Sequence, residues 1–172
     1  DLYDYLKLIY GKCNIQIVAI DIDPSLIERA KETHCNCNIT FLTLDIMTDF
    51  GKENIRKYLD SHKKESFDIT FCFSVTMWIH LNNGDDGLLA FLKYLKSISE
   101  SLVIEPQPWN CYRNAQRRMK KSGNTFPFYE SLKIRSDIEV VIENILSEKT
   151  HNKLYESQKS SWNRKIMSFT CI

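Results

Sequence analysis

Short apolar runs alternate with amphipathic segments over the first 104 residues, and this alternation restricts the possible folds most strongly. The apolar runs are rich in β-branched and aromatic side chains and cover residues 15–20, 39–44, 67–73 and 102–104. The segments between them, residues 25–33, 52–63 and 87–99, carry apolar side chains at helical spacing. Strands that alternate with helices in this way predict an α/β fold, in which helices cover both faces of a parallel sheet.

The two ends of the chain add further elements to this pattern. The opening residues DLYDYLKLIYGK predict an amphipathic helix that stops near Gly11, and residues 109–122 and 137–148 predict two more helices. Residues 152–158 and 165–171 have the composition of strands, and we expect them to pair antiparallel as a closing hairpin at the sheet edge. The chain contains no stretch with the character of a long linker. We therefore expect a single domain over residues 1–172.

Composition narrows the classes of protein further. The net charge is +1, so any affinity for nucleic acid must come from local clustering of basic residues. No apolar run approaches the roughly 18 to 20 residues that span a bilayer, and no secretory signal pattern occurs. Six cysteines are scattered along the chain, and Cys72 lies inside an apolar run. This distribution favours reduced thiols, and we expect a location in the cytoplasm or the nucleus, without membrane association.

One group of potential metal ligands needs separate consideration. Cys35 and Cys37 follow His34 closely, which suggests a metal site. A structural zinc site needs a second pair of ligands at suitable spacing, and the sequence does not supply one. We therefore expect no metal.

Two acidic residues follow the first two predicted strands. Asp21 comes directly after residues 15–20, and a carboxylate at that position can accept hydrogen bonds from both ribose hydroxyls of a nucleotide-like cofactor. Its alternative role, as the cap of the next helix, suits Asp23 better because Asp23 precedes Pro24.

Asp45 follows the second strand in the same manner and could accept a hydrogen bond from the adenine amino group. Ile22 and Ile46 would then line the faces of the ring. Acidic residues after two successive strands fit a class I S-adenosylmethionine-dependent methyltransferase better than a dehydrogenase.

Polar and aromatic residues gather after the third and fourth strands. Trp78, His80 and Asn82 follow the third strand, and a turn is expected at residues 83–85. The fourth strand leads into Glu105-Pro106-Gln107-Pro108-Trp109. Ligands in open α/β sheets bind outside the carboxyl ends of the strands, so these residues are candidates for a binding site. A solitary histidine is more often a structural hydrogen-bonding residue, and both roles remain open for His80.

The predicted helix at residues 109–122 carries a row of basic side chains. Arg113, Arg117 and Lys120 are spaced to lie on one side of the helix. Guanidinium groups match the geometry of phosphate oxygens, so this side could bind phosphate through Arg113 or Arg117. The alternative is an ordinary solvent-exposed face.

Two long motifs make the sequence specific. The first is SVTMWIHLNNGDDGL, and the second is EPQPW followed by Tyr112-Arg113. Together they resemble the bicoid-interacting-protein-3-type family of RNA 5′-phosphate methyltransferases. One branch of that family methylates the γ-phosphate of a small nuclear RNA, and the other methylates RNA 5′-monophosphates. Met77 and the run Ser161-Trp162-Asn163-Arg164 resemble the monophosphate branch.

The resemblance implies a Rossmann-like methyltransferase domain that uses S-adenosylmethionine. Asp21 and Ile22, with Asp45, Ile46 and Phe73, would contact this cofactor. His80, Glu105, Gln107 and Trp109 would form the catalytic set, and Tyr112, Arg113 and Arg117 would contact the phosphate and the RNA. The implied substrates are small RNAs with a 5′-phosphate, namely histidine transfer RNA and microRNA precursors. We expect the enzyme to act as a monomer.

The substrate also predicts a mechanism and a pH dependence. A phosphate oxygen is already anionic near neutral pH, so methyl transfer needs positioning and complementary charge rather than a general base. The second ionisation of a phosphate monoester lies near pH 6, so we expect methylation to weaken below about pH 6.

The sequence departs from the family pattern at its start. Neither the usual opening strand nor the glycine-rich loop occurs after Asp1. That strand normally lies between the first and third strands of this chain, so we expect a divided sheet and weak or no cofactor binding by these 172 residues. Two alternative functions remain. One is γ-phosphate capping of a small nuclear RNA, the activity of the other branch of the family. The other is a non-catalytic RNA-binding derivative, which the missing glycine-rich loop suggests.

Overall fold

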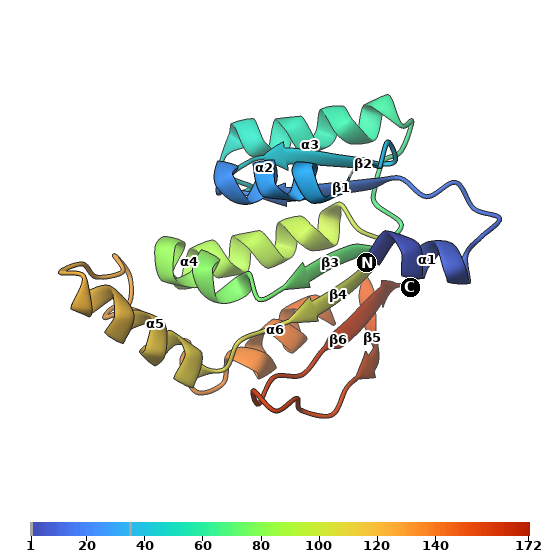
Figure 1. Ribbon diagram of the computed structural model, residues 1–172. Coiled ribbons are helices and arrows are strands. Elements are labelled where there is room, and N and C mark those ends of the chain that lie inside the picture. The colour runs from blue at the N-terminus through green and yellow to red at the C-terminus, as the bar shows by residue number, and fades with distance from the viewer. Residues whose placement is uncertain (1, 35) are drawn as a thin grey trace. The chain divides into compact units, whose positions relative to one another are not determined.

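The computed structural model describes residues 2–34 and 36–172 (Figure 1). The chain forms two compact units, Asp1–Tyr58 and Leu59–Ile172. Each unit is described by itself below, and the single methyltransferase domain stays a prediction. Within the described residues, no helix is both long and apolar enough to cross a membrane.

The first unit is built around a pair of parallel strands. Its elements in chain order are α1 (Leu2–Ile9), β1 (Ile17–Asp21), α2 (Pro24–Thr33), β2 (Ile39–Thr43) and the greater part of α3 (Asp49–Ser61). Ile17 lies opposite Ile39, and Asp21 lies opposite Thr43, so both strands end at the same edge. Asp23 caps α2 by accepting a hydrogen bond from the backbone N–H of Ser25 at 2.8 Å, as the sequence predicted.

The second unit contains a four-stranded mixed sheet. Its elements are β3 (Thr70–Phe73), α4 (Thr76–Ser97), β4 (Ser101–Glu105), α5 (Trp109–Lys121), α6 (Ile138–Leu146), β5 (His151–Glu156) and β6 (Met167–Cys171). The strand order is β3-β4-β6-β5, with β3 parallel to β4 and β6 antiparallel to β4. The final two strands pair antiparallel with β5 at the edge, which confirms the predicted hairpin.

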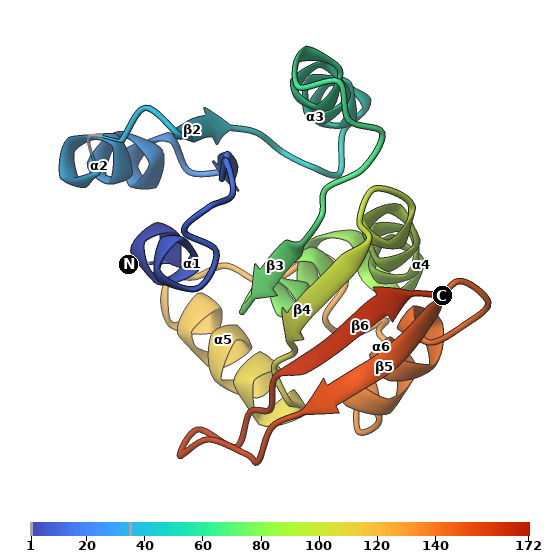
Figure 2. The ribbon, with the colours of Figure 1, turned by 90° about the vertical axis from the view of Figure 1, so that its right-hand side faces the viewer.

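Helices α4 and α6 lie on the same face of this sheet (Figure 2). Their apolar stripes supply fully buried side chains, including Leu88 and Leu92 of α4 and Ile142 of α6. The sheet contributes Leu102 and Phe169, which are also fully buried. Both helices therefore pack on one face of this sheet (Figure 2).

The segment that follows β3 differs from its prediction. The sequence suggested a loop, a turn at residues 83–85 and a helix from residue 87, but α4 already begins at Thr76. Gly84 interrupts the helix with a φ of 73° and produces a kink instead of a turn. The φ at this position favours glycine, and a Cβ atom would lie only 3.0 Å from the ring of Phe128, which would have to shift.

The strands form two separate sheets, β1-β2 and β3-β4-β6-β5. This division agrees with the divided sheet that was predicted, with the break between the first and third strands of the chain.

Candidate functional site

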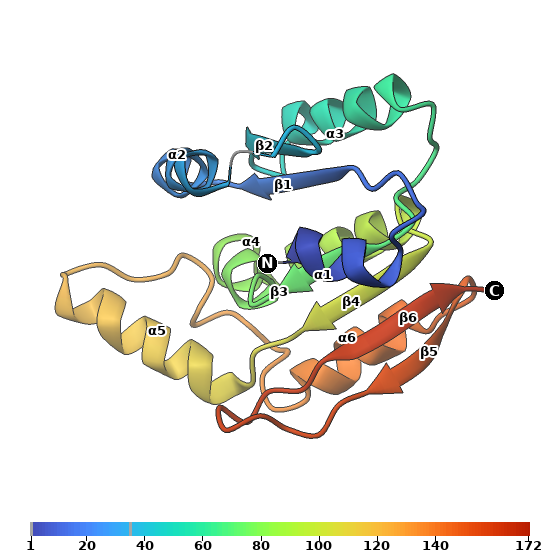
Figure 3. The same cartoon turned by 45° about the vertical axis from the view of Figure 1, so that its right-hand side comes forward.

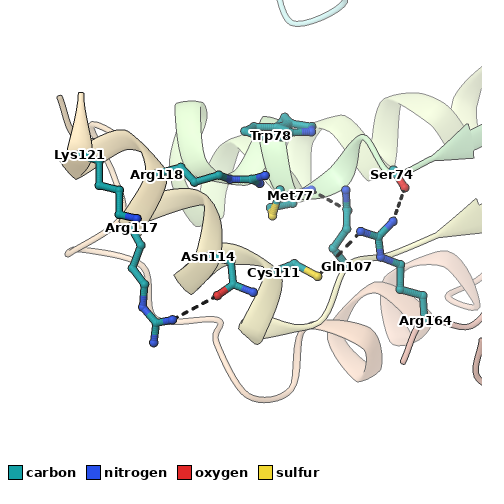
Figure 4. Close-up of a pocket in the computed structure, with 10 residues that line it drawn as sticks. All are labelled: Ser74, Met77, Trp78, Gln107, Cys111, Asn114, Arg117, Arg118, Lys121 and Arg164. Carbon is teal, nitrogen blue, oxygen red and sulfur yellow. Dashed lines mark hydrogen bonds between the residues drawn. The ribbon is translucent and has the colours of Figure 1, made fainter. Parts of the chain in front are cut away.

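A cavity of about 490 Å³ opens in the second unit, beside the end of β3 and the start of α4 (Figure 4). Helix α5 forms one wall, and the segment between β5 and β6 contributes one side chain. The residues that line the cavity are Ser74, Met77, Trp78, Gln107, Cys111, Asn114, Arg117, Arg118, Lys121 and Arg164. The motifs after β3 and β4 therefore meet at a common site, as the position of both at carboxyl strand ends predicted.

The electrostatic character of this cavity is strongly positive. Arg117, Arg118, Lys121 and Arg164 line it, and the lining contains no acidic residue. Figure 4 shows Arg118 directed toward the Trp78 ring, whereas Arg117 turns back along α5 toward Asn114, with a hydrogen bond of 3.4 Å. The N-terminal turn of α4 adds the positive end of a helix dipole. Guanidinium and ammonium groups around a cavity of this size suit an anion with several oxygen atoms, such as a phosphate.

Arg164 reaches the cavity from the segment before β6. Its Nη1 donates a hydrogen bond to Ser74 Oγ at 2.8 Å and lies 3.5 Å from Glu105 Oε2. Ser74 Oγ in turn donates to Glu105 Oε2 at 2.5 Å. The Arg164 Nε atom is buried and has no hydrogen-bond partner within the described part of the chain. Glu105 thus lies behind Arg164 and orients its guanidinium, instead of facing the cavity.

Gln107 connects the cavity to the start of α4. Its Oε1 accepts hydrogen bonds from Thr76 Oγ1 at 3.1 Å and from the backbone N–H of Met77 at 3.2 Å. Gln107 therefore satisfies an N–H group at the helix N-terminus that has no partner within the helix. Because the side-chain oxygen is occupied, the amide NH₂ remains as the donor group that can face a ligand.

His80 occupies a different environment from the one its predicted site role requires. It is completely buried, with Nδ1 at 3.1 Å from the Tyr112 hydroxyl and Nε2 at 2.7 Å from Asp85 Oδ1. Tyr112 is completely buried too. Both rings therefore lie outside the cavity lining, apart from the residues around which the catalytic role of His80 and the phosphate contact of Tyr112 were predicted. Their hydrogen bonds join α4 to α5, which is the structural role that remained open for His80.

Trp109 also lies outside the lining of the cationic cavity. Its ring stacks on Tyr112 and Tyr129, with centroid distances of 5.1 and 5.4 Å, and the Arg135 guanidinium lies 5.2 Å from its centroid. It lines a smaller cavity of about 240 Å³. Trp109 therefore anchors the start of α5 by packing, and the structure does not support its predicted place in the catalytic set.

The face of α5 that meets the cavity is shifted from the predicted one. Arg117 lines the cavity as expected, but Arg113 and Lys120 do not, and Arg118 and Lys121 take their place. A helical pattern identifies residues that share a face, but both faces of this helix are basic, so the pattern did not distinguish them. Arg164 was missed as a site residue although it ends the motif Ser161-Trp162-Asn163-Arg164.

The predicted cofactor residues of the first unit lie together. The carboxylates of Asp21 and Asp45 follow neighbouring strands, and the Leu44 N–H donates to the Asp21 carbonyl at 2.9 Å. Each carboxylate accepts one backbone N–H through Oδ1, from Asp23 for Asp21 and from Met47 for Asp45, both at 2.9 Å. These bonds orient the carboxylates.

Apolar surface accompanies these carboxylates. Ile22 is 67% exposed next to Asp21, and Ile46 is partly buried next to Asp45. Phe73, the fifth predicted cofactor residue, ends β3 in the second unit and is 45% exposed. An exposed isoleucine beside an oriented carboxylate fits a ligand with a flat ring and hydroxyl groups.

The described residues contain no cluster of three or more potential metal ligands. Cys35, one of the residues considered in the sequence, lies outside the described part of the chain.

Comparison with known proteins gives a consistent family match. The model of the family described as bicoid-interacting protein 3 (Bin3) matches residues 67–171. A pre-miRNA 5′-monophosphate methyltransferase of Xenopus laevis is 39% identical over 175 residues, which cover 98% of this chain and 69% of that protein. The RNA 5′-monophosphate methyltransferase of Bos taurus is 42% identical and covers 98% of this chain and 59% of its own length. The human RNA 5′-monophosphate methyltransferase is also 42% identical, with coverages of 90% and 54%.

Solved structures agree on the fold at lower identity. The N-methyltransferase NodS from Bradyrhizobium japonicum WM9 is 12% identical, with a TM-score of 0.59 over 97% of this chain and 79% of that chain. Magnesium protoporphyrin IX methyltransferase from Synechocystis PCC 6803, solved with bound SAH, is 15% identical, with a TM-score of 0.57 and coverages of 98% and 70%. These similarities show the class I methyltransferase fold that the sequence predicted.

Proposed function

Because the chain belongs to the bicoid-interacting protein 3 family, we propose that it methylates the 5′-monophosphate of RNA with S-adenosylmethionine as the methyl donor. The chain spans about 54% to 69% of the length of the curated relatives compared above, so the activity of a whole protein is part of the proposal. The observation that carries it is the cavity with four cationic side chains and no acidic one in its lining. The names of those relatives favour the monophosphate over γ-phosphate capping.

The residues of the first unit fit the methyl donor. Asp21 would hold the ribose hydroxyls and Asp45 the adenine amino group, since both carboxylates are oriented at neighbouring strand ends. Exposed Ile22 would cover one face of the adenine ring. When bound, S-adenosylmethionine supplies an electrophilic methyl group on a sulfonium.

The cavity residues account for the acceptor side of the reaction. Arg118, Lys121 and Arg164 would bind the phosphate oxygens of the acceptor. The attacking oxygen is already ionised near neutral pH, so no residue has to remove a proton. The bond from phosphate oxygen to methyl carbon forms as the carbon–sulfur bond breaks, and the protein acts through position and charge. This role does not need His80, in agreement with its complete burial.

We also propose the finer identity of the substrates and the setting of the reaction. The substrates would be small RNAs, among them microRNA precursors, which the name of the Xenopus laevis relative supports. Histidine transfer RNA is proposed on the family resemblance alone. The protein would act as a monomer in the cytoplasm or the nucleus.

The test compares RNA ends that differ only in phosphorylation. Radioactive methyl transfer and fluorescence anisotropy are measured with one short RNA that carries a 5′-hydroxyl, a 5′-monophosphate or a 5′-triphosphate. We expect binding and methylation to favour the monophosphate. Equal binding to the hydroxyl and monophosphate ends would refute the proposal, and preferred methylation of the triphosphate would support capping instead.

Variants on α5 assign the effect to the cavity. Arg118→Ala and Lys121→Ala should each reduce the preference for the 5′-monophosphate by roughly tenfold, the effect of one charged hydrogen bond. Arg113→Ala and Lys120→Ala change basic residues of the same helix that do not line the cavity, and they serve as matched controls. If the control variants lose the preference and the cavity variants keep it, the proposed site is wrong.

A further inference from the structure

The segment between β5 and β6 carries an exposed tryptophan next to the cationic cavity. Trp162 is 72% exposed, the largest exposed fraction among the aromatic side chains described as exposed. An exposed indole presents a large flat apolar ring together with one N–H donor, a combination that is enriched at binding interfaces. In Figures 1 and 3, this segment lies beside the start of α5, whose side chains form one wall of the cavity.

A hydrogen-bonded turn holds Trp162 in position. The Ser160 N–H donates to the Arg164 carbonyl at 2.7 Å, and the Asn163 N–H donates to the Ser160 carbonyl at 2.8 Å. Asn163 adopts a left-handed φ of 58°, which this residue type tolerates better than most. At the base of the segment, the Ser157 N–H donates to the Ile166 carbonyl at 2.9 Å. The indole is therefore presented on an ordered support.

The same turn places Arg164 between the indole and the cavity. The guanidinium carbon of Arg164 lies 5.7 Å from the centroid of the Trp162 ring, a cation–π arrangement. Its Nη1 donates to Ser74 Oγ, and Nη2 lies 3.9 Å from Cys111 Sγ in the cavity lining. Arg164 therefore occupies one face of the indole, and a ligand can still approach the exposed part of the ring.

We propose that Trp162 stacks on a base at the 5′ end of the RNA while Arg164 of the same turn contacts the terminal phosphate. This inference rests on the proposed function and adds a substrate-binding residue to it. A nucleotide carries a charged phosphate and a flat base a few ångströms apart, and the turn offers a guanidinium and an indole at a comparable spacing. Stacking on an indole tolerates all four bases, so this contact contributes affinity without selecting a sequence.

The stack also selects among RNA ends by their structure. An unpaired base can turn toward a tryptophan ring, whereas a paired terminal base is held in the plane of its duplex. Trp162 should therefore assist RNA with a single-stranded 5′ end more than RNA whose 5′ end lies in a blunt duplex.

The experiment uses the 172-residue chain and short 5′-phosphorylated single-stranded RNAs with a fluorophore at the 3′ end. One RNA carries natural bases, and the other is abasic at its first two positions. Trp162→Ala and Trp162→Phe are compared with Tyr155→Ala, which removes another exposed aromatic ring, from β5. Anisotropy titrations at fixed salt give the dissociation constants.

Trp162→Ala should weaken binding of the natural RNA by about tenfold, within the range measured for stacking of one base. Trp162→Phe should retain most of the affinity, and Tyr155→Ala should bind like the unmodified chain. All variants should bind the abasic RNA equally. Equal affinity of Trp162→Ala and the unmodified chain for the natural RNA would overturn the stack, and so would an equal loss on both RNAs.

The outcomes separate this inference from the proposed function. An unmodified chain that does not distinguish a 5′-phosphate from a 5′-hydroxyl overturns both. A chain that requires the phosphate but does not depend on Trp162 overturns the stack alone.

Discussion

Asp85 Oδ1 lies 2.7 Å from His80 Nε2, across the kink that Gly84 introduces into α4. The same carboxylate accepts hydrogen bonds from the backbone N–H groups of Lys133 at 2.9 Å and Ile134 at 3.3 Å. His80 Nδ1 is hydrogen-bonded in turn to the Tyr112 hydroxyl in α5, at 3.1 Å. One partly buried network therefore joins the two helices that border the cationic cavity to the segment before α6.

Replacement of Asp85 should destabilise the second unit. In Asp85→Asn, one carboxylate oxygen becomes an NH₂ group that must face N–H donors, so at least one hydrogen bond of the network is lost. We expect the free energy of unfolding to fall by about 2 to 3 kcal/mol in urea titrations. Asp86→Asn changes an exposed neighbour and should remain within about 0.5 kcal/mol. Equal effects of the two variants would show that the network contributes no stability.

The network also predicts how stability depends on pH. Burial lowers the pKa of His80 below its ordinary value of 6.5, and this effect exceeds the opposing influence of Asp85. The unfolded chain therefore binds a proton at a higher pH than the folded chain does. The stability due to neutral His80 is present above about pH 6.5 and is lost as the pH falls toward the lowered pKa.

The free energy of unfolding should therefore depend on pH more steeply in the unmodified chain than in His80→Gln between pH 7 and pH 5. The unmodified chain should lose up to about 1.4 kcal/mol per pH unit more than the variant. Titration of Asp85 does not contribute to the pH dependence of stability between pH 7 and pH 5. Burial raises its pKa, but the hydrogen bonds from His80 and the backbone outweigh burial and leave the pKa below 3.8, so its effect appears only at lower pH. Parallel pH profiles of the two proteins would contradict the prediction.

Gly84 should be intolerant of a side chain. In Gly84→Ala, the new methyl group would meet the Phe128 ring at 3.0 Å, and the backbone would keep an unfavourable φ of 73°. We expect thermal and urea unfolding to show a loss of about 1 to 3 kcal/mol. Gly87→Ala, in a regular part of the same helix, should be neutral or stabilising by up to about 1 kcal/mol. A stable Gly84→Ala variant would mean that the kink is not required.

The guanidinium geometry of Arg164 should be important beyond its charge. Arg164→Lys keeps the charge but loses the planar group that contacts Ser74 and lies beside Glu105. We expect the preference for a 5′-monophosphate over a 5′-hydroxyl end to fall roughly tenfold in anisotropy titrations. Arg113→Lys provides the matched control on α5, outside the cavity lining. An unchanged preference in Arg164→Lys would assign the phosphate to the α5 residues alone.

The ionisation of the substrate should control the methylation rate at low pH. Since a phosphate monoester takes up a proton near pH 6, the rate of methyl transfer should fall below about pH 6 at saturating RNA. Because this decline is due to the RNA phosphate and not to the protein, the pH–rate profile of Arg113→Lys should show the same decline. A flat rate from pH 5 to pH 8 would contradict a dianionic acceptor.

Local signals in the sequence were sufficient for most of the secondary structure. Asp23-Pro24 identified the start of α2, and the apolar runs located every strand to within a few residues. The Asn83-Gly84-Asp85 segment misled the prediction, because these residue types favour turns. Here Gly84 makes a kink, and Asp85 uses its carboxylate to hold residues 133 and 134. Such a partner, far away in the sequence, leaves no local signal.

The sequence by itself determined the α/β class, the oriented pair of acidic residues at Asp21 and Asp45, and the family motifs that meet after β3 and β4. These features depend on periodicity and turn chemistry, which are properties of neighbouring residues. Only the tertiary structure decided which side of α5 lines the cavity, that His80 is buried, and that Arg164 reaches Ser74. These outcomes depend on how side chains distant in sequence pack and share hydrogen bonds, and a linear pattern of residue types does not encode that geometry.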